Sequence, residues 1–198
     1  MSALFIYGLF VWGCVEGLRR PWAGLVMFFT FVALEPKWNW RWAIDTSFPY
    51  QKYLAACVVA GLCLQGFRRA RVSGTAFSAL ACLIAFLGVG YIATLQSINF
   101  QYSLEYMSYV WKIVLMTTLT VWLIDTPRKI WILLSVLILC QGYNAFQINL
   151  QYFEDGFSRY AVNGWGVKGD NNTYSIFTVP FIAMSCGMAI YGRTLWQR

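Results

Sequence analysis

Histidine is absent from the sequence, and charged residues make up only 12% of its 198 residues. The lack of His excludes His-based acid–base catalysis, His metal ligands and the usual His pH switch. None of the six cysteines has C-x-x-C spacing, which excludes zinc and thioredoxin-like sites. The motifs H-E-x-x-H, G-x-S-x-G and the Walker lysine loop are also missing. We therefore predict no metal and no cofactor, and any chemistry must depend on Arg, Lys, Asp, Glu or a partner.

Apolar residues dominate the composition, with 59% hydrophobic and 19% aromatic residues, including ten Trp. This is typical of a membrane protein whose aromatic rings lie at both membrane boundaries. A membrane-spanning helix needs about 20 mainly apolar residues, and the sequence holds about seven such runs. We predict an all-α polytopic membrane protein with one transmembrane domain over 1–198. Its helices are expected at 2–18, 22–35, 53–67, 75–95, 107–124, 130–149 and 174–192.

The net charge of +7 comes from short basic clusters between the apolar runs. Such clusters mark the cytoplasmic side of a membrane protein, and they are not the continuous stripe that binds nucleic acid. We therefore predict an outer amino terminus, a cytoplasmic carboxyl terminus and no nucleic-acid partner. The residues assigned to the cytoplasmic side are Arg19, Arg20, Arg68, Arg69, Arg71, Arg128, Lys129, Arg193 and Arg198.

Two longer loops are expected on the outer side, at 36–52 and 151–173. The first contains Trp38, Trp40 and Trp42, which alternate along the chain. An aromatic belt at the membrane boundary explains this pattern. The alternative interpretation is a stacking platform for sugar rings.

The second outer loop contains NGWGVKGDNN at 163–172, which spells the dinucleotide-binding pattern G-x-G-x-x-G. That function requires a preceding β-strand and a cytoplasmic nucleotide, and neither is expected here. We interpret the stretch as a turn into the last helix, for which Asp170, Asn171, Asn172 and Thr173 are all suitable N-cap residues. The N-terminus of that helix can bind an anion, with Lys168 beside it and Arg159 in the same loop.

Lys112 is an ionisable residue inside an apolar run, which makes it a functional candidate. It shares one helix face with Glu105 and Tyr109 at i, i+4, i+7 spacing. The run is expected to begin near 107, so Lys112 lies about two turns from the outer boundary. Its ammonium can extend to water, pair with a carboxylate or bind an anionic substrate group.

The predicted helix at 130–149 carries a line of amides that fall within about a third of its circumference. Lipid would leave these amides without hydrogen-bond partners. They are therefore expected to face another helix as interhelical contacts, or to line a cavity for a hydroxyl-rich ligand. The amides are Gln141, Asn144, Gln147 and Gln151.

Two stretches resemble a known family. The segment 19–56, which begins RRPWAGLVMFF, is similar to the amino-terminal region of exosortase-associated O-glycosylation ligases, within the O-antigen ligase and polymerase superfamily. The tetrapeptide G-D-N-N at 169–172 resembles a second element of that group, in the expected order. Family members are longer, and the residues held to be catalytic lie in their second half. The resemblance therefore covers the amino-terminal half only.

The resemblance implies a glycosyltransferase-C-like helical bundle in the bacterial inner membrane. Such enzymes transfer a glycan from undecaprenyl pyrophosphate to an acceptor at the outer face of the membrane. Lys112, Arg159 and Lys168 are then candidates for binding the pyrophosphate, and the remaining half is expected to be needed for catalysis. The alternative is a non-catalytic membrane scaffold or accessory subunit of a larger complex, and a small transporter is the third hypothesis.

Overall fold

The computed structural model describes residues 2–66, 73–157 and 171–195. Within these ranges the chain is helical and contains no strand, which confirms the predicted all-α class. The helices are α1 (Ser2–Arg19), α2 (Pro21–Leu34), α3 (Pro36–Asn39), α4 (Tyr50–Leu64), α5 (Gly74–Leu95), α6 (Phe100–Leu123), α7 (Pro127–Asp155) and α9 (Asn171–Leu195).

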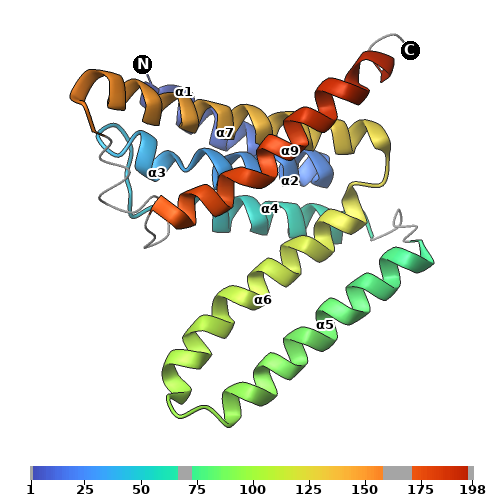
Figure 1. Ribbon diagram of the computed structural model, residues 1–198. Helices are drawn as coiled ribbons and strands as arrows, with labels where there is room; N and C mark the ends of the chain where they lie inside the picture. Colours follow the sequence, from blue (N-terminus) through green and yellow to red (C-terminus); the bar gives the residue numbers. More distant parts are fainter. Residues whose placement is uncertain (1, 67–72, 158–170, 196–198) are drawn as a thin grey trace.

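Helices α1, α2 and α4 pack on one another and form the centre of the molecule, which we call the body together with α7 (Figure 1). Helix α7 lies along α2, and α9 packs on α7. Leu25 and Val58 of the body are completely buried. A methyl group added at Gly24 or Gly61 would collide with the backbone of Gly17. The three helices therefore approach one another closely because these positions lack side chains.

Helices α5 and α6 form an antiparallel hairpin that projects away from the body (Figure 1). Helix α5 packs along α6, and Thr94 is its only buried residue. The carboxyl-terminal half of α6 anchors the hairpin, because Met116 and Leu119 join the core formed by Leu25 and Val58. The remainder of the hairpin lies outside the body.

By length and composition, α5 and α7 can each cross a membrane. At about 1.5 Å per residue, a helix of 22 residues such as α5 extends about 33 Å, close to the thickness of a bilayer core. Shorter apolar helices occur at Pro21–Leu34, Tyr50–Leu64 and Thr178–Ile190. The arrangement of seven spans stays a prediction.

Several helices extend beyond the predicted apolar runs. Helix α6 begins at Phe100 and not near 107, and α7 continues to Asp155 and not 149. The outer loop expected at 36–52 contains α3 and the first three residues of α4. Hydrogen bonding explains the early start of α6, because the Asn99 side chain accepts the Tyr102 N–H at 3.2 Å and caps the helix in a polar segment. Apolar runs therefore mark the helix centres better than their ends.

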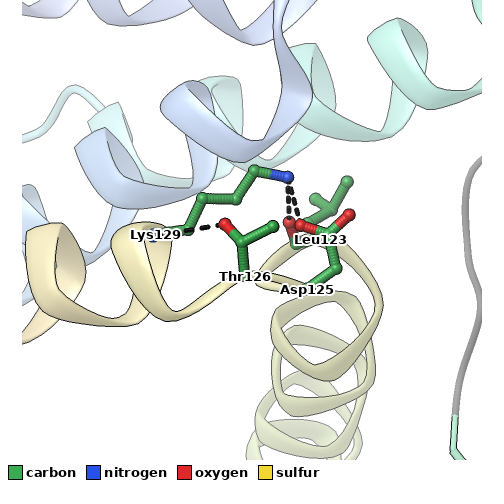
Figure 2. A network of polar contacts seen from close by, with 4 residues as sticks. All are labelled: Leu123, Asp125, Thr126 and Lys129. Atoms are coloured by element: carbon green, nitrogen blue, oxygen red, sulfur yellow. Dashed lines mark hydrogen bonds and ion pairs between the residues drawn. The ribbon is translucent and has the colours of Figure 1, made fainter.

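The turn between α6 and α7 fixes the base of the hairpin (Figure 2). Thr126 is the N-cap of α7 and Pro127 is its first residue. The Thr126 hydroxyl accepts the Lys129 N–H at 3.5 Å. The Lys129 ammonium forms an ion pair with Asp125 and donates to the Leu123 carbonyl at 3.1 Å, which satisfies one of the last carbonyls of α6.

Candidate functional site

The side of α6 opposite α5 carries the two charged residues of the hairpin, Glu105 and Lys112. Met107 faces α5, because its side chain lies within contact distance of the Gly90 position. At about 100° per residue, Glu105, Tyr109 and Lys112 point about 140–160° away from Met107. All three side chains are exposed, and the Lys112 ammonium lies 5.1 Å from the centroid of the Tyr109 ring. This cation–π contact holds the ammonium toward the amino-terminal end of α6.

Lys112 lies in the middle of α6 and not near its end. It is 12 residues after Phe100 and 11 before Leu123, the bounds of the helix. At 1.5 Å per residue, it is about 18 Å from the amino-terminal end. The helix begins earlier than the predicted apolar run, and the depth of Lys112 below a membrane boundary stays a prediction. A lysine side chain of ordinary length is too short to reach that end of the helix.

The predicted amides of α7 meet the end of α2. Asn144 is 1% exposed, and its Nδ2 donates to the Ala33 carbonyl at 2.7 Å. The Nδ2 of Asn39 donates to Asn144 Oδ1 at 2.9 Å and to the Leu34 carbonyl. The last carbonyls of a helix have no partner within it, so these two amides complete α2. Asn144 therefore makes contacts between helices, which is one of the two predicted roles. Its role in binding sugars stays a prediction.

Gln141 extends this network to α9. Its side chain is 2% exposed, and its Nε2 donates to the Thr178 hydroxyl at 3.0 Å. Its Oε1 lies 3.5 Å from Asn144 Nδ2, at the long end of hydrogen-bond distances. Glu35 ends α2 in a left-handed conformation, with φ of 44°, which costs about 1–2 kcal/mol in a residue other than Gly. The amide network stabilises this unusual helix end.

The tryptophan loop divides into a packed part and an exposed part. Trp40 stacks on Tyr143 of α7, with ring centroids 5.6 Å apart and nearly parallel planes. Trp42 is 75% exposed. The side chain of Trp38 lies outside what the structure describes. Trp40 is packed and Trp42 is exposed, although the two residues alternate along the chain. The loop is not extended throughout, because α3 occupies its start.

The end of the same loop is ordered by Asp45. Its carboxylate accepts the hydroxyl of Ser47 at 2.7 Å and the backbone N–H of Ser47 at 2.8 Å. These hydrogen bonds lower the pKa of Asp45 below its ordinary value. The backbone N–H of Asp45 also donates to the Tyr7 hydroxyl at 3.1 Å, which ties the loop to α1. A local turn therefore connects the loop to the body.

Only part of the predicted site can be placed. Arg159, Lys168 and Asp170 lie outside the described residues, and Asn171 is the first residue of α9. Lys112 projects from the hairpin, whereas Gln141 and Asn144 are enclosed between α2, α7 and α9. In the described part of the chain, no group of three or more His, Cys, Asp or Glu residues lies together.

Two residues of the amide and aromatic cluster were missed by the sequence reasoning, Asn39 and Tyr143. Asn39 lies between the tryptophans at 38 and 40, and Tyr143 lies beside Asn144 on α7. The available signals were an amide inside the Trp segment and a tyrosine next to Asn144 on the predicted helix. Neither signal indicates which residues meet, because 105 positions separate Asn39 from Asn144.

Residues 1–183 match the protein family described as a family of unknown function (DUF5935). The match includes the body, the hairpin and the first half of α9, so all of them belong to one family unit. No curated protein and no solved structure matches the chain. The function must therefore be inferred from the resemblance of the sequence and from the geometry of the site.

Proposed function

The chain belongs to DUF5935, a family of unknown function, and we propose that it is the amino-terminal membrane part of a lipid-linked glycan ligase. Its substrate is a glycan on undecaprenyl pyrophosphate at the outer face of the bacterial inner membrane. The resemblance of 19–56 and 169–172 to exosortase-associated ligases of the O-antigen ligase superfamily supports this proposal. Catalysis requires residues of the second half, and this part binds the carrier within a glycosyltransferase-C-like arrangement of about seven spans.

The exposed Lys112 in the middle of α6 is the observation that carries the proposal. If α5 crosses the membrane, α6 crosses beside it, because the two helices pack antiparallel through a short connection. A cation at this depth is costly in lipid and is found facing a protein interior or a water-filled cavity, with an anionic partner. A carrier pyrophosphate supplies that anion, and Tyr109 orients the ammonium toward it.

The placement of basic residues supports the orientation proposed for the membrane. Lys129 lies over the ring of Trp22, at 5.7 Å from its centroid. This contact brings the start of α7 next to the start of α2, which Arg19 and Arg20 precede. Basic residues from two separate loops therefore gather at one end, which the positive-inside rule assigns to the cytoplasm. The α5–α6 connection then lies on the outer side.

A non-catalytic scaffold or accessory subunit is the second candidate. The observation that favours it is the exposure of α5, whose apolar window is entirely unburied. An apolar helix of this kind contacts either lipid or another membrane protein. The two candidates differ in one property, because a scaffold has no reason to bind the pyrophosphate of a lipid carrier.

Binding of the carrier can be measured with the full chain in nanodiscs. The probes are undecaprenyl pyrophosphate and the uncharged undecaprenol, detected by native mass spectrometry. We expect the pyrophosphate form to bind more tightly, and Lys112→Ala to weaken it by about ten- to a hundredfold, since hydrogen bonds to charged groups contribute about 1.5–3 kcal/mol. Lys112→Arg should retain most of the binding.

The matched control is Lys52→Ala, which removes an exposed lysine of α4 on the same proposed outer side. It should leave the affinity unchanged. Equal affinity of the wild type and Lys112→Ala for undecaprenyl pyrophosphate would exclude the assignment of Lys112. Equal binding of undecaprenol and its pyrophosphate by the wild type would favour the scaffold.

A further inference from the structure

We propose that the tip of the α5–α6 hairpin holds a binding site for an uncharged sugar ring, an inference that rests on the proposed function. The tip is the connection at 96–99 with the adjoining turns of both helices. A cavity of about 440 Å³ opens there, within the range of about 300–1,000 Å³ that is common for small-molecule sites. It is lined by Gly90, Ala93, Thr94, Ser97, Tyr102, Ser103, Tyr106 and Met107.

Hydroxyl groups supply the polar part of the lining. The Oγ atoms of Ser97 and Ser103 lie 2.6 Å apart and share one hydrogen bond, so one hydroxyl proton and several lone pairs remain for a ligand. The Thr94 hydroxyl donates to the Gly90 carbonyl at 2.8 Å and keeps its acceptor capacity. None of the lining residues is Asp, Glu, Lys or Arg, which favours an uncharged ligand over an anion or a cation.

Two tyrosines supply the apolar part. Tyr102 and Tyr106 are one turn apart on α6, and they are 70% and 65% exposed. Each ring offers a flat apolar face together with a hydroxyl group. A pyranose has the complementary surface, because its axial C–H groups form an apolar face and its hydroxyl groups surround the edge. A hydrocarbon chain would offer no acceptor to the one serine hydroxyl proton that the Ser97–Ser103 bond does not use, so the lining favours a sugar over a lipid tail.

The position of the cavity agrees with the proposed carrier site. Tyr106 precedes Lys112 by six residues, which corresponds to about 9 Å along α6. The cavity lies between Lys112 and the proposed outer side. The cavity opens on the α5 side of α6 and Lys112 lies on the opposite side. A carrier whose pyrophosphate contacts Lys112 would therefore pass around α6 to place its first sugars at Tyr106, Tyr102 and the serine pair.

Saturation-transfer NMR on the full chain in sugar-free phospholipid nanodiscs tests this site. The probes are methyl β-D-glucoside and N-acetylglucosamine, with glucuronate as the charged comparison. We expect transfer to the two uncharged sugars and at least about tenfold weaker affinity in Ser97→Ala/Ser103→Ala, which loses two hydroxyl partners. Ala93→Trp fills the cavity without removing a hydrogen bond, and it should give the same loss.

Ser78→Ala is the matched control, because Ser78 lies on α5 near its opposite end and bonds to the Gly74 carbonyl. It should bind sugar like the wild type. Equal sugar signals in the wild type and both cavity variants, or equal signals for glucuronate, would overturn the proposal. Lys112→Ala separates the two proposals: it should lose affinity for undecaprenyl pyrophosphate and retain the free sugars, whereas the serine variant should do the opposite.

Discussion

In α2 and α4, the apolar side chains of Leu25, Leu54 and Val58 are completely enclosed by protein, whereas in α5 Phe86 and Val89 are 65% and 64% exposed. The body and the hairpin are both built from apolar helices. The body buries a core that α5 lacks, although its outer faces also expose large apolar side chains such as Phe5 and Leu139. Burial therefore depends on the partners that a helix meets and not on its apolar content alone. The exposed hairpin is the region whose natural surroundings must supply the contacts, and we propose that lipid and a lipid carrier supply them.

Glycine substitutions should give the largest difference in the free energy of unfolding between the body and the hairpin. Gly61→Ala places a methyl group against the backbone of Gly17, so we expect a loss of about 3 kcal/mol in the free energy of unfolding. Gly88 of α5 has no atom within 4 Å of the added methyl group. Gly88→Ala should therefore be neutral or stabilise the protein by up to about 1 kcal/mol. Thermal unfolding in nanodiscs, followed by circular dichroism, measures both. Similar losses in the two variants would contradict a packed body and an open hairpin.

The second-largest loss of stability should come from a substitution in the buried amide network of α7. Asn144→Ala removes the partner of the Ala33 carbonyl and one of the two hydrogen bonds of the Asn39 amide, and we expect a loss of about 1–3 kcal/mol in the free energy of unfolding. The control is Asn149→Ala on the same helix, where the exposed amide bonds only to the Ala145 carbonyl one turn before. It should cost less than about 0.5 kcal/mol. Chemical denaturation of both variants gives the values, and an equal cost would show that the network does not stabilise the end of α2.

A smaller effect is expected at the joint between the body and the hairpin. Lys129→Gln removes the Asp125 ion pair and the cation–π contact with Trp22, and about 0.5–1 kcal/mol should be lost because the groups are partly exposed. Arg128→Gln changes the exposed neighbouring charge and is the control. Distances between spin labels on α4 and α6 should broaden in the Lys129 variant alone. Unchanged distances would show that Lys129 does not hold the hairpin in place.

The smallest effect is the pH dependence of the loop before α4. The hydrogen bonds from Ser47 lower the folded-state pKa of Asp45, so their contribution is present at neutral pH and is lost as the pH falls through that lowered pKa. Hydrogen exchange of the Ser47 amide should therefore be slower above that pKa than below it. Asp45→Asn should remove this pH dependence. An unchanged profile in the variant would show that another group orders the loop.

Local features were predictable from the sequence, and long-range contacts were not. The all-α class follows from composition and was confirmed for the described residues, and the cap at Thr126 depends only on neighbouring residues. The start of α6 lies before the predicted apolar run, because a polar cap at Asn99 begins the helix in a polar segment. The pairing of Asn39 with Asn144 depends on how α2 and α7 pack, and nothing in either local segment encodes that contact.

The proposed function depends most directly on whether the hairpin lies in the membrane with its tip at the surface. Spin labels at Phe86→Cys on α5 and Ile98→Cys at the tip, in a chain whose six native cysteines are replaced, test this in nanodiscs. We predict that the label at position 86 collides frequently with oxygen and rarely with a water-soluble nickel chelate, and that the label at 98 shows the reverse. Equal nickel accessibility at the two positions would contradict the membrane placement of the hairpin.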